Sequence, residues 1–300
     1  MEKKLIITEF TDPVCTWCWG SEPVLRKLQT VYQDQLDVRF IMGGLVPDIS
    51  DFMDAANQIG GNPEDSNKQV AKHWLEASER HGMPVKVDDF NLFSAEYPST
   101  YPQNIAYKAA QIQDQKLADK FLRRMREAST AEGRLISHLD VQIELASEVG
   151  LSVSDFIVNM KNGEAERAFK DDLAITQSLK VRGFPTFLVE YGEKSVMMRG
   201  FNRFEDFMAV TKDYLNATDL ETFDIIKDEA HILNFIQKFE RVTPKEISET
   251  FDLTDKEYNK MMTSLADQGK IVQIEAGNGF FIEPSTNALN CDTETGVCSI

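Results

Sequence analysis

Near its start the chain reads Lys4-Leu5-Ile6-Ile7-Thr8-Glu9-Phe10-Thr11-Asp12-Pro13-Val14-Cys15-Thr16-Trp17-Cys18. Residues 4–10 are mostly apolar and β-branched, which is typical of a buried strand, and the turn around Pro13 ends that strand. A helix is expected to begin at about Cys15 and to run to Tyr32, because apolar residues recur there at helical spacing. Residues 36–42 predict a second strand, so the chain begins in the order strand, helix, strand.

Cys15 and Cys18 form a CxxC pair at the predicted start of this helix. Unpaired backbone N–H groups and the positive end of the helix dipole stabilise a thiolate at such a position. The second thiol lies one helical turn away and can resolve a mixed disulfide or close an intramolecular one. Cys15 is therefore expected to be the exposed nucleophile and Cys18 the more buried resolving thiol. Half of a zinc site is the alternative, because CxxC also binds zinc.

The pattern is helical between residues 48 and 180 and returns to strands afterwards. Apolar residues recur at steps of three and four in segments 51–60, 65–81, 102–130, 138–149, 153–161 and 163–180. Residues 186–191 and 195–199 predict a hairpin, and 204–215 predict a closing helix. The expected fold is α/β, with a β-containing core that is split by a large helical insertion.

A proline opens the first strand of that hairpin, in Val181-Arg182-Gly183-Phe184-Pro185-Thr186. Proline at a strand entry removes an amide donor and can adopt the cis form. Together with the upstream Cys15–Cys18 pair, this proline resembles the thioredoxin superfamily. The resemblance implies that Pro185 is cis and that the backbone of Phe184 pairs with substrate. An ordinary strand-entry proline is the alternative.

The helical insertion narrows the resemblance to the DsbA branch of that superfamily. The segments Asp12-Pro13-Val14-Cys15-Thr16-Trp17-Cys18-Trp19-Gly20, Met42-Gly43-Gly44-Leu45 and Tyr101-Pro102-Gln103-Asn104-Ile105-Ala106 look like those of predicted dithiol–disulfide isomerases of the FrnE group. The resemblance covers residues 1–215. It implies a thioredoxin fold. Trp17 and Trp19 flank Cys18; one of them, Trp17, is expected to line the substrate surface, and the other only to pack. Thr16 stands where many relatives carry proline, which leaves the redox poise open.

The resemblance also assigns a role to Glu9, which lies six residues before Cys15. Thioredoxins and DsbA proteins place a buried acid at this offset. A desolvated carboxyl has a raised pKa and can exchange a proton with the resolving thiol. The alternative is a polar side chain on the exposed face of a half-buried strand.

A second unit is predicted after the polar residues 216–221. Helical periodicity runs over 223–239, Thr243 and Thr254 are expected to cap two further helices, and a hairpin over 270–282 follows. Three helices followed by a hairpin is the order of a winged-helix domain. We therefore expect a DsbA-like domain over 1–217, a winged-helix-like domain over 218–284 and a polar tail over 285–300.

The charge of the chain limits its partners. The chain of 300 residues has a net charge of −17, and residues 218–300 hold 7 Lys and Arg against 16 Asp and Glu. Nucleic acid is therefore not an expected partner, because phosphate contacts need basic side chains, and docking on an anionic membrane is disfavoured for the same reason. No apolar run is long enough for a membrane span and no signal peptide is recognised, so we expect a cytoplasmic protein.

The remaining cysteines, Cys291 and Cys298, lie in the tail. Some FrnE-like proteins also carry a second pair near the C-terminus, which suggests a relay dithiol that exchanges electrons with Cys15 and Cys18. A passive tail disulfide and a clip for a soft metal are the alternatives.

These observations predict a cytoplasmic thiol–disulfide oxidoreductase or isomerase that acts on protein disulfides without an organic cofactor or a metal. Cys15 attacks, Cys18 resolves, Glu9 accepts the proton, and Phe184, Pro185 and Trp17 bind the substrate. A reductant or a regulatory protein would dock on residues 218–300. The alternative is an adaptor of the SpxH group, which resembles a DsbA-like domain with a C-terminal extension and delivers a transcription factor to the ClpXP protease.

Overall fold

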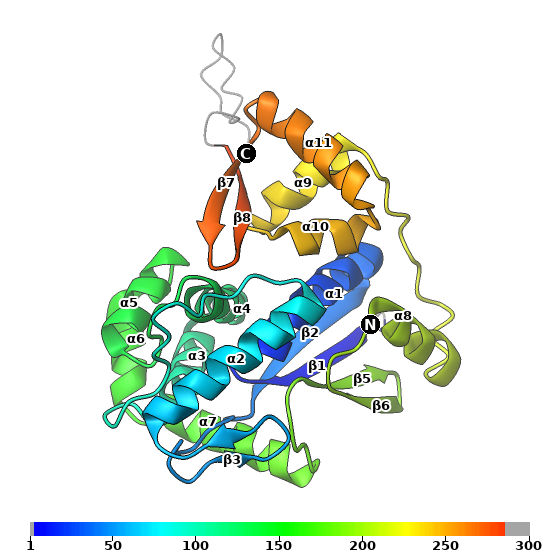
Figure 1. Cartoon of the computed structure of the whole chain (residues 1–300). Helices are drawn as coiled ribbons and strands as arrows, with labels where there is room; N and C mark the ends of the chain where they lie inside the picture. Colours follow the sequence, from blue (N-terminus) through cyan, green and yellow to red (C-terminus); the bar gives the residue numbers. More distant parts are fainter. Residues whose placement is uncertain (1–2, 286–300) are drawn as a thin grey trace.

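A four-stranded sheet forms the centre of the N-terminal unit (Figure 1). Strand β1 (Leu5–Thr11) pairs in parallel with β2 (Leu36–Met42), with Leu5 opposite Leu36. On its other side β1 pairs antiparallel with β5 (Thr186–Tyr191), which continues through a hairpin into β6 (Lys194–Arg199). The strand order is therefore β2-β1-β5-β6, and β2 is an edge strand. The computed structural model describes residues 3–285.

One face of this sheet is covered by α1 (Thr16–Tyr32) and α8 (Phe204–Ala209), which share an apolar core with it. The ring centroids of Phe187 on β5 and Phe207 on α8 lie 5.1 Å apart. The predicted closing helix continues past α8 as a short π-helical turn, Val210–Tyr214. The apolar side of α1 packs on this face of the sheet, and only a short turn separates the start of α1 from the end of β1.

The insertion is helical, as predicted, and most of its apolar side chains pack in one core that also includes Trp19 of α1 and Phe281 of the C-terminal hairpin. Its helices are α2 (Pro63–His81), α3 (Tyr101–Gln113), α4 (Gln115–Arg126), α5 (Leu139–Glu148), α6 (Val153–Lys161) and α7 (Glu164–Ser178). The thioredoxin fold with a helical insertion is thereby confirmed. None of the helices in residues 3–285 has the length and apolar character needed to cross a membrane.

Two predictions for the insertion are wrong. Residues 51–60 form a small hairpin of β3 (Met53–Asp54) and β4 (Ile59–Gly60), because the Asp54 carboxylate accepts the backbone N–H groups of Ala56 and Asn57 and closes a turn. The single helix expected over 102–130 is broken at Asp114. That residue is extended and caps α4 by accepting the Leu117 N–H, and a π-helical turn, Glu127–Ala131, follows α4.

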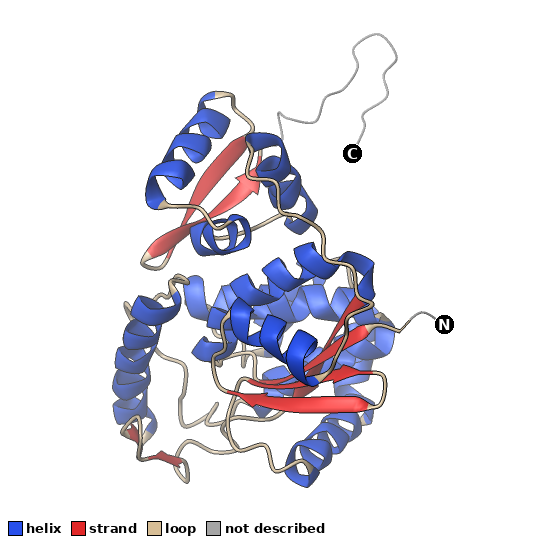
Figure 2. Cartoon of the chain, turned by 90° about the vertical axis from the view of Figure 1, so that its right-hand side faces the viewer, coloured by secondary structure: helices blue, strands red, loops and turns tan. Residues whose placement is uncertain are grey.

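The C-terminal unit contains α9 (Glu229–Phe239), α10 (Pro244–Phe251), α11 (Asp255–Asp267), β7 (Ile271–Ala276) and β8 (Gly279–Pro284) around a separate core (Figure 2). This element order matches the one predicted, whereas its winged-helix identity and the domain boundaries stay predictions. The first helix begins at Glu229 and not at Phe223, because Asp228 caps it by accepting the His231 N–H. Thr243 and Thr254 cap α10 and α11 as expected.

The hairpin tip of the C-terminal unit docks on the loop that follows α2. Asn278 N–H donates to the Val85 carbonyl over 2.9 Å, and Val85 N–H donates to Asn278 Oδ1 over 2.8 Å. Gly277 has a φ of +53°, and a Cβ atom there would lie 2.3 Å from the Val85 carbonyl oxygen. Only glycine therefore allows this close approach of the two backbones.

Gly277→Ala is expected to loosen this contact. The control is Gly150→Ala, because Gly150 also has a positive φ, +87°, but a Cβ atom there would have no neighbour within 4 Å. Both substitutions carry the left-handed penalty of about 1–2 kcal/mol, and only Gly277→Ala adds a backbone clash. Hydrogen exchange should therefore quicken at the Val85 amide in Gly277→Ala alone. Equal exchange in the two variants would contradict the docking role of the tip.

Candidate functional site

Cys15 is the N-cap residue of α1, so the CxxC pair lies where sequence reasoning expects it. The Cys15 Sγ accepts the Cys18 backbone N–H over 3.3 Å, and both thiols are free. Cys18 is fully buried, as the more buried thiol of the prediction. Cys15 is only 5% exposed, so the prediction that it is exposed is wrong. The Cys15 N–H donates to the Asp12 carbonyl, and this turn folds the cysteine back against the end of β1.

Asp12 holds the turn before the dithiol, a function that sequence reasoning missed. Its buried carboxylate accepts hydrogen bonds from Val14 N–H, Leu45 N–H, Thr100 Oγ1 and Asn104 Nδ2 at 2.7–3.1 Å. Burial raises the pKa of Asp12, and these four donors oppose that rise. The carboxylate thus joins the dithiol turn to two segments of the insertion. The only sequence feature that pointed to Asp12 was its position at the start of the motif that runs from Asp12 to Gly20.

The Phe184–Pro185 peptide bond is cis. Pro185 directly precedes β5, and Thr186 lies opposite Phe10 of β1, so the proline lies at the end of the sheet where β1 leads into the dithiol turn. The Pro185 carbonyl accepts the Gly200 N–H over 2.8 Å. The Phe184 ring lies against Gly43, where a Cβ atom would come within 2.0 Å of Cζ.

Glu9 is fully buried, which excludes its placement on an exposed strand face. Its Oε1 lies 3.0 Å from Nη2 of Arg126, a fully buried side chain from α4. Burial raises the pKa of Glu9, and Arg126 opposes that rise. Burial likewise raises the pKa of Cys18, with further increases from Cys15 and Glu9, whereas Arg126 lowers it. The proton-acceptor function of Glu9 stays a prediction.

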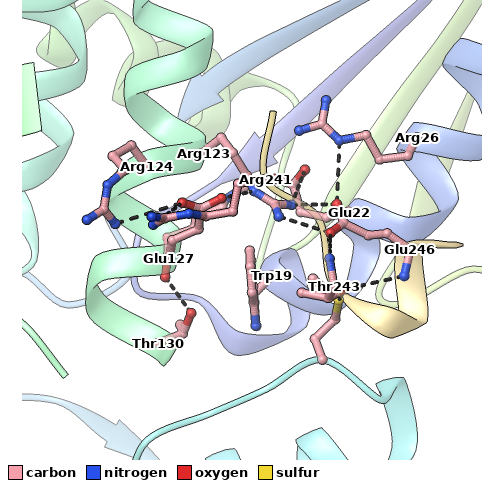
Figure 3. Close-up of polar contacts among 12 residues, drawn as sticks. Trp19, Glu22, Arg26, Arg123, Arg124, Glu127, Thr130, Arg241, Thr243 and Glu246 are labelled. Atoms are coloured by element: carbon pink, nitrogen blue, oxygen red, sulfur yellow. Dashed lines mark hydrogen bonds and ion pairs between the residues drawn. The ribbon is translucent and has the colours of Figure 1, made fainter. Parts of the chain in front are cut away.

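Arg126 belongs to a buried ion network that extends into the C-terminal unit, and Figure 3 shows the part of it that joins Glu22, Arg123 and Glu246. The Arg126 guanidinium also pairs with Glu22 of α1. Arg123 lies 3.3 Å from Glu22 and 2.7 Å from Glu246 of α10. Burial alone would raise the pKa of Glu22, but Arg123 and Arg126 hold it at about 2. Alternating charges therefore connect the surroundings of Cys18 to α10.

Trp19 lies at the same junction. Its Nε1 donates to the Pro84 carbonyl over 2.9 Å, and the Arg123 guanidinium lies 4.5 Å from its ring. The ring of Phe281, from β8, meets it edge-on with centroids 6.4 Å apart. The residue that follows Cys18 thus contacts both the insertion and the C-terminal hairpin.

An aromatic surface surrounds Trp17, which is partly exposed. Its Nε1 donates to His73 Nε2 over 3.2 Å, and its ring lies 6.0 Å from that of Phe201, which is 37% exposed. The sequence alone assigns no role to the histidines, yet His81 Nε2 lies 3.3 Å from the Oγ1 of Thr16, a residue between the two cysteines. Both histidines come from α2, far away in the sequence, so local patterns gave no signal for them.

The predicted tail pair, Cys291 and Cys298, lies outside the described residues. The same holds for a zinc site that would join these cysteines to Cys15 and Cys18. Within residues 3–285, no three His, Cys, Asp or Glu side chains are grouped as metal ligands.

His81 is expected to make the fold sensitive to acid. Burial lowers its pKa from 6.5 to about 4, and its Nδ1 accepts the Met83 N–H. The folded protein therefore favours the neutral imidazole. The resulting contribution to the free energy of unfolding is complete above the unfolded-state pKa of 6.5 and is lost as the pH falls towards 4. This contribution amounts to about 3 kcal/mol. His81→Asn should flatten the dependence of the urea midpoint on pH between 7 and 4, and an unchanged slope would contradict this prediction.

Curated relatives align along nearly the whole chain. The ClpXP adapter protein SpxH of Halalkalibacterium halodurans is 27% identical over 283 residues, which are 92% of this chain and 88% of that protein. The protein of the same name from Bacillus subtilis is 27% identical over 292 residues, which are 93% and 89% of the two chains.

Solved structures resemble about seven-tenths of the chain. The cytosolic disulfide reductase DsbM from Pseudomonas aeruginosa has a TM-score of 0.55 and 24% identity, covering 71% of this chain and 99% of its own. A 2-hydroxychromene-2-carboxylate isomerase has a TM-score of 0.50 and 17% identity, covering 72% and 99%. Two different activities on one fold mean that these likenesses establish the fold alone.

The sequence model of the thioredoxin family matches residues 9–208. The matched range begins at Glu9 and includes both cysteines of the CxxC pair and Pro185. The chain therefore belongs to the thioredoxin family, and SpxH adapters are among the proteins to which it is similar.

Proposed function

We propose that this protein is a cytoplasmic adaptor that delivers a client protein to the ClpXP protease. The observation that carries the proposal is the extent of the alignments with SpxH adapters, which cover 92% and 93% of this chain. So few residues remain unaligned that the alignments must include most of the C-terminal unit. The DsbM structure covers only 71% of the chain, as expected of a protein without that unit.

The way in which the C-terminal unit is attached supports this function. Glu246 is fully buried and is held by two hydrogen bonds from Arg123, at 2.7 and 3.0 Å. Arg26 of α1 approaches the same carboxylate at 3.5 Å. A buried carboxylate with two basic partners fixes the orientation of α10 against α1 and α4, because breaking such a pair is costly. Two units in a fixed orientation can present one composite surface to a client.

A second function, thiol–disulfide exchange, is favoured by the free Cys15–Cys18 pair at the start of α1. In this proposal the Cys15 thiolate attacks a protein disulfide and forms a mixed disulfide, and one substrate thiolate leaves. Cys18 then gives its proton to Glu9 and attacks Cys15 Sγ, which releases the second substrate thiol and leaves a Cys15–Cys18 disulfide. A cellular dithiol reductant returns the two electrons.

The same surroundings would bind the substrate. Pro185 and Phe184 lie at the end of the sheet next to the dithiol turn, and Trp17 contributes the partly exposed aromatic surface. An extended substrate segment pairs with the backbone in such a position, and aromatic side chains add apolar contact.

Adaptor activity is tested by degradation of the SpxH-group client transcription factor with purified ClpXP. The protein should quicken degradation, and Cys15→Ser/Cys18→Ser should preserve that effect. Glu246→Ala should reduce it, because Arg123 loses the carboxylate that joins α10 to α4. The control is Glu249→Ala, which removes only the pair with Lys245 on α10. No acceleration by the wild-type protein would refute the adaptor proposal.

Exchange activity is tested by reduction of insulin disulfides. Cys15→Ser should abolish turnover, and Cys18→Ser should accumulate a mixed disulfide that mass spectrometry detects. Glu9→Gln should slow resolution by roughly a hundredfold without slowing attack, because a general base is lost. Glu190→Gln, on β5 opposite Ile6, is the matched control. Turnover that survives Cys15→Ser would exclude this mechanism.

A further inference from the structure

A groove of about 810 Å³ lies between the thioredoxin unit and the C-terminal unit. Val38 and Phe40 of β2 line it, together with Gln29 of α1, Lys116 of α4 and Lys238 of α9. We call this site the β2 groove. Its volume lies towards the upper end of the roughly 300–1,000 Å³ that small-molecule pockets occupy, and charged side chains dominate its walls.

The free edge of β2 runs along this groove. Gly43 N–H donates to Thr11 at the end of β1, whereas Met42 N–H donates to Asp172 Oδ2 on the opposite side. Backbone groups alternate in direction along a strand, so those of Val38 and Phe40 point away from β1. Within residues 3–285, β2 pairs with no strand other than β1. The backbone N–H and C=O groups of Val38 and Phe40 are therefore available to pair with another strand.

Two buried polar atoms at the walls, Gln29 Oε1 and Arg124 Nη1, form no hydrogen bond with any described residue. Arg124 Nη1 lies 3.8 Å from Glu127 Oε2, as an ion pair without a hydrogen bond. The Gln29 and Arg124 side chains both line the β2 groove. Figure 3 shows Arg124 on α4. Buried polar atoms normally have a partner, so a polar ligand would satisfy both.

The groove is more basic than the rest of the chain. Seven Lys and Arg and six Asp and Glu line it, in a protein with a net charge of −17. Lys120 and Arg241 are paired with Glu240 and Glu283. Among the described residues, Lys116 and Lys238 are not paired with any acid. An occupant with negative charge would complement these two lysines.

We propose that the β2 groove binds an extended acidic segment of the client protein, which adds as a strand to the edge of β2. The inference rests on the adaptor function proposed above and assigns its client surface. Backbone hydrogen bonds to Val38 and Phe40 would provide affinity, and acidic side chains would pair with Lys116 and Lys238. Both units line the groove, which explains why the C-terminal unit is needed for delivery.

The probe for this site is a fluorescent peptide of alternating glutamate and valine, whose binding to the full chain is measured by anisotropy. Val38→Pro removes one outward N–H that bonds to nothing in the described chain, and edge strands tolerate proline. It should weaken binding by about tenfold relative to Val38→Ala, which loses the same side chain but keeps the N–H. Lys238→Glu should also weaken binding, whereas Lys256→Glu, on α11 outside the groove, should not.

If Val38→Pro and Val38→Ala bind the peptide with equal affinity and have unchanged circular dichroism, the strand-addition proposal is refuted. This holds even if the protein still accelerates client degradation. Equal binding of a lysine–valine peptide would overturn the acidic preference. Affinity that rises tenfold on removal of residues 286–300 would assign the groove to the chain's own C-terminus. A dimer that Val38→Pro dissociates would assign it to a second copy. Peptide binding that meets every expectation without accelerated degradation would refute the adaptor function and retain the groove.

Discussion

The buried guanidinium of Arg126 is the interaction on which the arrangement of this molecule depends. It has no exposed surface, so its charge has lost hydration worth several kcal/mol. Glu9 on β1 and Glu22 on α1 compensate for that loss from two different elements. These three side chains form their ion pairs only when the sheet, α1 and α4 are correctly placed relative to one another. Arg123, one helical turn earlier on α4, likewise pairs with two acids from different elements, Glu22 and Glu246 of the C-terminal unit.

Local patterns in the sequence predicted much of the fold and the centre of the site. The bounds of β2 and α6, the caps at Thr243 and Thr254, and the CxxC pair at a helix start all follow from signals within a few residues. Such signals are reliable because they reflect side-chain period and backbone capping. Cis geometry at Pro185 followed from one proline considered together with a distant motif.

Long-range partners could not be predicted in the same way. Arg126 lies 117 residues from Glu9, and the arginine-rich end of α4 looks like an ordinary helix terminus. His81 reaches Thr16 across 65 residues, so nothing near either residue indicates the contact. The hairpin at 53–60 was missed for the opposite reason: the hydrogen bonds that the Asp54 carboxylate accepts from nearby backbone N–H groups outweighed an apparent helical period. In each case a specific polar contact decided the structure.

The position of Trp19 gives the molecule an internal optical reporter. The indole lies one residue beyond the dithiol, is fully buried, and contacts both an arginine and the C-terminal hairpin. Indole emission shifts with the polarity of its surroundings and is quenched by neighbouring sulfur and charged groups. Separation of the two units or a change at the thiols would therefore alter the emission of Trp19, one of three native tryptophans, without any attached dye.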